Sequence, residues 1–65
     1  MGFYYQTYVP KNERHFNNML RQFRLCQNKK ELADIEILWV FDLSVNRQDI
    51  IVALGRVERE KGWNK

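Results

Sequence analysis

The chain has 65 residues, of which 45% are hydrophobic and 29% charged, a composition too apolar for a disordered tail. We expect one small domain, residues 1–65, with marginal stability because so short a chain buries only about 60% of its unfolded surface. Cys26 is the single cysteine and His15 the single histidine, which excludes an internal disulfide and falls short of a four-ligand structural zinc site. A second subunit is the remaining means of stabilisation, so we expect a homo-oligomer, with a dimer favoured.

The charge is unevenly distributed along the chain. Residues 1–30 carry six basic side chains against one acidic, a net charge of +5, whereas residues 31–65 carry five against seven, a net charge of −2. A polyanion such as duplex DNA would therefore meet the first half by preference, although the same basic residues can simply solvate a surface. No stretch approaches 18 consecutive apolar residues and no signal-peptide pattern opens the chain, so we expect a cytoplasmic protein without membrane contact.

The first two predicted elements are a strand and a helix. The segment at about 3–9 is aromatic and β-branched with alternating sides, which predicts a short strand ended by Pro10. Asn12 can then cap an amphipathic helix over about 12–27. Its apolar stripe follows the spacing of one helix face and comprises Phe16, Met19, Leu20, Phe23 and Cys26.

The segment at about 31–42 fits two patterns. Ile35, Ile37, Trp39 and Phe41 alternate as in a strand, and this β-branched and aromatic content favours the strand slightly. A helical stripe through Leu32, Ile35, Leu38 and Trp39 fits as well, so the segment is predicted as strand or helix.

The predicted C-terminal helix, at about 46–61, has the most consistent local signals. Asn46 is placed as its N-cap, Asp49 lies in the first turn, and Gly62 follows as the C-terminal stop. Val45 and Ile50 are spaced as a hydrophobic staple. The stripe that we expect to be buried comprises Ile50, Ile51, Leu54 and Val57.

These elements predict a small, helix-dominated α+β fold. The alternative is a strand at 22–27 followed by two helices, because QFRLCQNKKEL (22–32) also alternates. In that reading residues 22–62, with SVN at 44–46 opening a helix that closes at EREKG, resemble the ribbon-helix-helix family of Arc-type dimeric DNA-binding repressors. The resemblance implies that Gln22 and Arg24 face the bases from an intersubunit ribbon with Cys26 in the third outward place, and that the backbone amides after Ser44 hold a phosphate.

The sequence carries no motif of a nucleotide-binding loop, a serine hydrolase, a metalloprotease or a paired-cysteine site. We therefore expect no enzyme activity, no cofactor and no metal. The function predicted first is a small DNA-binding regulator that acts through a basic, Arg/Asn/Gln-rich surface in residues 11–30. The nucleic-acid-binding residues expected from these patterns are Arg14, Arg21, Gln22, Arg24, Lys29, Lys30 and Asn46.

The alternative is a protein-binding inhibitor or adaptor, of the kind that mobile elements encode. It would act through the N-terminal aromatic segment FYYQTY and the basic helix, because Tyr, Trp and Arg are the usual anchors of protein interfaces. Salt dependence separates the two hypotheses, since DNA affinity falls steeply as counterions are released.

Overall fold

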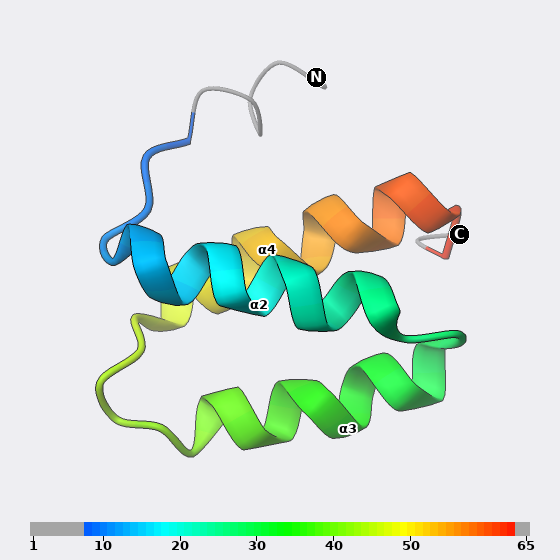
Figure 1. Ribbon diagram of the computed structural model, residues 1–65, viewed down its shortest axis with the longest axis horizontal. Helices are drawn as coiled ribbons and strands as arrows, with labels where there is room; N and C mark the ends of the chain where they lie inside the picture. Colours follow the sequence, from blue (N-terminus) through cyan, green and yellow to red (C-terminus); the bar gives the residue numbers. More distant parts are fainter. Residues whose placement is uncertain (1–7, 64–65) are drawn as a thin grey trace.

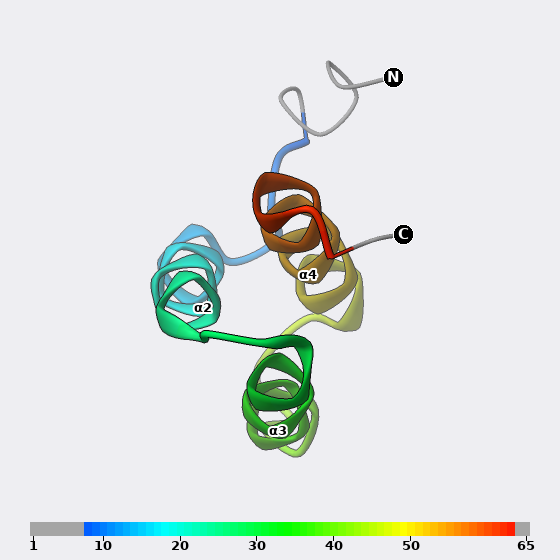
Figure 2. The same ribbon diagram turned by 90° about the vertical axis from the view of Figure 1, so that its right-hand side faces the viewer.

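The computed structural model describes residues 8–63, and within that range it contains three helices and no strand. They are α2 (Glu13–Leu25), α3 (Lys29–Val40) and α4 (Arg47–Lys61). Consecutive helices run in opposite directions (Figure 1), and the view along their axes shows them at the corners of a triangle (Figure 2). The described part of the chain is therefore an up-down-up bundle of three helices.

The predicted α+β class is wrong, because the described residues form helices only. Most of the strand expected at about 3–9 lies outside the described residues, and Tyr8 and Val9, which are described, do not belong to a strand. The ambiguous segment at 31–42 is helical. The strand preference of its β-branched side chains is outweighed by the burial that a helix allows, since Leu32, Ile35 and Trp39 all pack on the core.

The alternative with a strand at 22–27 is also wrong. Residues 22–25 form the last turn of α2, and Cys26, the C-cap, is extended, with φ −67° and ψ 140°. The reason is the position of Phe23, which is fully buried and continues the stripe of Phe16 and Met19. If residues 22–27 formed a strand, Phe23 would no longer lie on the same face as Phe16 and Met19, and the apolar stripe would be broken. The described residues therefore contain no ribbon of the ribbon-helix-helix type.

The helix starts follow the sequence closely. Asn12 caps α2 by accepting a hydrogen bond from the His15 amide at 3.0 Å, as predicted. Asn28 caps α3 by accepting from the Glu31 amide at 2.9 Å, and the Glu31 carboxylate accepts from the Gln27 amide at 2.8 Å. This reciprocal arrangement, close to a capping box, ends α2 and starts α3 within three residues.

The C-terminal helix is confirmed. Asn46 accepts hydrogen bonds from the amides of Gln48 and Asp49, and Gly62 ends α4 in the left-handed conformation at φ 73°. The expected stripe is only partly right. Ile50 and Val57 are buried and Leu54 is partly buried, but Ile51 is 55% exposed.

The core lies between the three helices and takes most of its residues from α2 and α4. Its buried apolar side chains are Phe16, Met19, Leu20, Phe23, Cys26, Leu32, Val45, Ile50, Val52, Ala53 and Val57. α3 supplies only Leu32 to this set, with Ile35 and Trp39 packed against it. One helix of the bundle thus contributes much less apolar surface to the interior than the other two.

Candidate functional site

The residues predicted to bind nucleic acid do not form one surface. Arg24 lies on the flank of α2 that faces α4, where its Nε and Nη2 donate to the two carboxylate oxygens of Glu60 at 3.0 and 2.8 Å. These hydrogen bonds hold the pKa of the Glu60 carboxyl below its usual range. The pair is about half exposed, so the guanidinium is neutralised without being hidden from solvent.

Two further predicted residues serve the fold. The Gln22 side-chain oxygen accepts a 3.0 Å hydrogen bond from the Trp39 indole and so links α2 to α3. Asn46 uses its side-chain oxygen to cap α4. The side-chain oxygens of both residues are therefore engaged in hydrogen bonds within the fold, whereas a base-reading role would require them to be available.

Two of the predicted arginines do face solvent along α2. Arg14 and Arg21 are both exposed and are seven residues apart, which places them within about 20° of each other around a helix axis. Asn18 lies between them and accepts from Arg21 at 3.2 Å. We call Arg14, Asn18 and Arg21 the α2 basic ridge. Among the described residues, no carboxylate forms an ion pair with either arginine.

The two predicted lysines lie elsewhere, in the first turn of α3. Both Lys29 and Lys30 are exposed, and Lys30 forms an ion pair with Asp34 one turn later, at 3.6 Å. Such a pair contributes little to stability because both groups remain in water. The seven predicted residues are therefore divided between the α2 basic ridge, the start of α3 and internal contacts.

The most unusual surface of the described chain is apolar. Five large hydrophobic side chains are exposed along the second half of α3 and the turn after it: Ile37 (51%), Leu38 (67%), Val40 (38%), Phe41 (78%) and Leu43 (98%). We call these five residues the α3 apolar surface. Isolated exposed hydrophobic residues are ordinary, but five within seven positions form a patch of the kind that marks a binding site.

The position of α3 in the bundle explains this surface. α3 packs on α2 and α4 through a stripe containing Leu32, Ile35 and Trp39, and its other side is not covered by any described helix (Figure 2). The sequence from Ile35 to Phe41 is apolar at every position except Glu36. Such a run carries more apolar side chains than one buried stripe can take, so the surplus faces solvent. That surplus is the sequence signal for this surface, and its alternation fits a strand as well as a helix.

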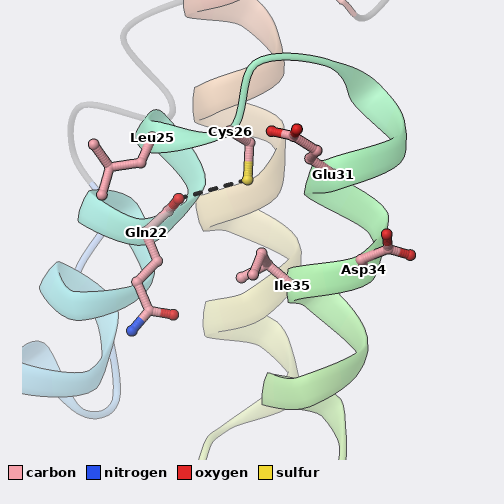
Figure 3. Close-up of a pocket in the computed structure, with 6 residues that line it drawn as sticks. All are labelled: Gln22, Leu25, Cys26, Glu31, Asp34 and Ile35. Atoms are coloured by element: carbon pink, nitrogen blue, oxygen red, sulfur yellow. Dashed lines mark hydrogen bonds between the residues drawn. The ribbon is translucent and has the colours of Figure 1, made fainter.

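A groove lies beside this surface, between the end of α2 and the first half of α3 (Figure 3). Its volume is about 410 Å³, and its lining residues are Gln22, Leu25, Cys26, Glu31, Asp34 and Ile35. Leu25 on the rim is 75% exposed, and Leu38 follows Asp34 by one helical turn. The groove therefore adds apolar area next to the α3 apolar surface, with two carboxylates at its edge.

Cys26 in this groove is a packing residue. Its side chain is 5% exposed, and its Sγ lies 3.6 Å from the Gln22 carbonyl oxygen, to which it donates. Burial, together with the nearby charge of Glu31, raises the pKa of the thiol. A thiol in this setting is a weak nucleophile.

The described residues hold no group of three or more His, Cys, Asp or Glu side chains arranged to bind a metal ion. None of the helices between residues 8 and 63 has the length and apolar character needed to cross a bilayer. No protein-family model matches the chain, and comparison with the curated proteins and with the solved structures finds no match either.

Proposed function

We propose that this protein is a small interaction module that binds another polypeptide through the α3 apolar surface. The observation that carries the proposal is the exposure of five large hydrophobic side chains from Ile37 to Leu43, on a helix whose opposite side already serves the core. Covering apolar surface contributes about 25 cal/mol per Å², so leaving this patch in water is costly. Charged residues border it, with Lys30 and Asp34 before it and Asp42 within the turn, as in the polar rim of an interface.

This surface differs from the one expected for protein binding. The predicted aromatic segment lies largely in residues 1–7, outside the described residues. Tyr8, which is described, packs against Phe16 and donates to Asp49. The basic helix contributes to the core rather than to the apolar patch. The α3 apolar surface therefore replaces the N-terminal segment as the proposed contact.

Site-specific photo-crosslinking in the cells that normally make the protein tests this proposal. A photoreactive amino acid is introduced at Phe41, within the surface, and in a matched variant at Gln48, which is exposed at the start of α4. We expect a discrete crosslinked band from position 41 and none from position 48. The proposal fails if neither position gives a band, or if both give the same diffuse products.

A second candidate function is binding to nucleic acid through the α2 basic ridge. It is favoured by Arg14 and Arg21, which lie two turns apart on the same exposed face of α2 without a carboxylate partner among the described residues. Two such side chains would contact phosphates on one strand. The DNA affinity of arginine variants should then depend on whether the arginine lies on the α2 basic ridge, and not only on the total charge that is removed.

Fluorescence anisotropy with a random 20-base-pair duplex at about 50 mM salt tests this second function. We expect Arg14→Ala and Arg21→Ala each to weaken binding and to lower the salt slope by about one. Arg47→Ala, which removes an exposed arginine at the start of α4, is the matched control and should leave affinity unchanged. Equal losses from all three changes would indicate attraction by net charge alone.

A further inference from the structure

We infer that the polypeptide bound by the α3 apolar surface is a second copy of this chain, with the two α3 helices packed antiparallel about a twofold axis near Ile37. The inference rests on the proposed function, since it names the partner of that same surface. Its basis is the self-complementarity of α3.

The outward side of α3 has the spacing of a helix-pairing seam. Lys30, Ala33, Ile37 and Val40 recur at intervals of three and four residues, which is the a and d pattern of paired helices. All four are exposed, and Leu32, Ile35 and Trp39 occupy the other side of the helix against the core. α3 therefore carries one stripe for its own bundle and a second, apolar at Ala33, Ile37 and Val40, that is left for a partner.

The seam is complementary to itself when the second helix runs in the opposite direction. An axis at Ile37 places Ile37 against its own copy and sets Ala33, a small residue, opposite Phe41, which is 78% exposed. Alternation of small and large side chains across a contact is what close packing requires. The same alignment brings Lys30 within one helical turn of the partner's Asp42, so the charges at the two ends are also complementary. A parallel arrangement would instead bring Lys30 against its own copy.

The size of the surface suits such a pair. The described chain has an accessible surface of 4819 Å². Covering about a tenth of it on each copy would bury roughly 1,000 Å² in total, the lower end of specific interfaces. α3 lies along one edge of the bundle in both views, so a second α3 can approach without displacing α2 or α4 (Figures 1 and 2). We therefore expect a reversible dimer rather than a permanent one.

Sedimentation velocity over protein concentrations from low to high micromolar tests the dimer, using the full chain. Ile37→Glu places a charge at the proposed axis, and Ile51→Glu is a closely matched control, because both isoleucines are about half exposed on a helix but Ile51 lies on α4. We expect the wild type and Ile51→Glu to form the same dimer. Ile37→Glu should weaken dimerisation by about thirtyfold or more, as a central interface residue would. Circular dichroism of both variants should show unchanged helix content.

Disulfide trapping tests the position of the twofold axis at Ile37. In a Cys26→Ala background, Ile37→Cys places one thiol on each side of the axis, and diamide as oxidant takes up the two electrons and two protons released when the two sulfurs join. We expect rapid formation of a covalent dimer from Ile37→Cys and little from Ile51→Cys. Equal trapping at both positions would show random collision and overturn the axis at Ile37.

The outcomes separate this inference from the proposed function. A wild type that stays monomeric at all concentrations, while position 41 crosslinks to a polypeptide of another mass, overturns the second copy and leaves the interaction surface standing. A monomer without any specific crosslink overturns both. A dimer that Ile37→Glu and Ile51→Glu weaken equally overturns the α3 contact.

Discussion

The phenol of Tyr8 donates a 2.5 Å hydrogen bond to the carboxylate of Asp49, 41 positions further along the chain. The same carboxylate accepts from the backbone amides of Lys11 and Asn12, both at 3.0 Å. Asp49 is completely buried in the first turn of α4, so it attaches the segment before α2 to the start of the last helix. A carboxylate buried here is stabilised by these three donors and by the helix dipole.

The Asp49 contact should make stability depend on pH. Burial opposes ionisation of Asp49, but the hydrogen bonds from Tyr8, Lys11 and Asn12 outweigh it, so the pKa of the carboxyl is lowered. When the pKa of a carboxyl is lower in the folded state than in the unfolded state, its ionised form stabilises the fold. This stabilisation is fully present above the unfolded-state pKa and is lost as the pH falls through the folded-state pKa. In urea titrations we expect this loss below about pH 4.

Asp49→Asn should abolish that contribution, because an amide offers one acceptor oxygen in place of two and leaves a buried donor unpaired. The expected loss is about 1.5–3 kcal/mol in the free energy of unfolding at pH 7. Tyr8→Phe is the milder comparison, removing one donor only. An Asp49→Asn variant with wild-type stability and an unchanged acid transition would contradict this account.

The difference in burial between Met19 and Ile51 predicts a large difference in the stability lost on substitution by alanine. Met19 is fully buried between the helices, so Met19→Ala should cost about 2–5 kcal/mol, a large fraction of the total stability of so small a domain. Ile51→Ala, at a half-exposed site on α4, should change stability by about 0.5 kcal/mol or less. Thermal unfolding followed by circular dichroism measures both. Similar melting temperatures for the two variants would show that the core is placed wrongly.

Arg24 should contribute modestly to stability and little to any binding. Its pair with Glu60 is bidentate but half exposed, so a double-mutant cycle with Arg24→Ala and Glu60→Ala should give a coupling of about 0.2–1 kcal/mol that shrinks at high salt. Duplex affinity, where it is detectable, should fall less for Arg24→Ala than for Arg14→Ala. A larger loss of duplex affinity for Arg24→Ala than for Arg14→Ala would indicate that Arg24 is part of the binding surface.

Asn46 offers a test of a structural role against a binding role. Asn46→Ala removes the acceptor for the Gln48 and Asp49 amides and should cost about 0.5–2 kcal/mol. Asn46→Asp keeps the cap and should retain most of the stability, since both residues are good N-caps. Chemical denaturation distinguishes them. Equal destabilisation by Asp and Ala would mean that the cap is not the relevant contact.

The sequence by itself determined the helix boundaries that local hydrogen bonds set. The caps at Asn12 and Asn46 and the stop at Gly62 were predicted because side-chain oxygens within three residues, and one left-handed glycine, decide them. The stripe of α2 was predicted for a similar reason, because Phe16, Met19 and Phe23 share one face at helical spacing, although residues 22–27 also fitted an alternating strand.

Tertiary structure decided the rest. Residues 35–41 carry apolar side chains on both sides, so their pattern fits a strand and a helix, and only the packing of Leu32, Ile35 and Trp39 against the other helices selects α3. The same packing leaves Ile37 and Phe41 in solvent and so creates the candidate surface. Arg24 and Gln22 were assigned outward from local spacing, but their partners Glu60 and Trp39 are 36 and 17 positions away. Contacts over such separations follow from how the helices pack, which no local pattern in the chain specifies.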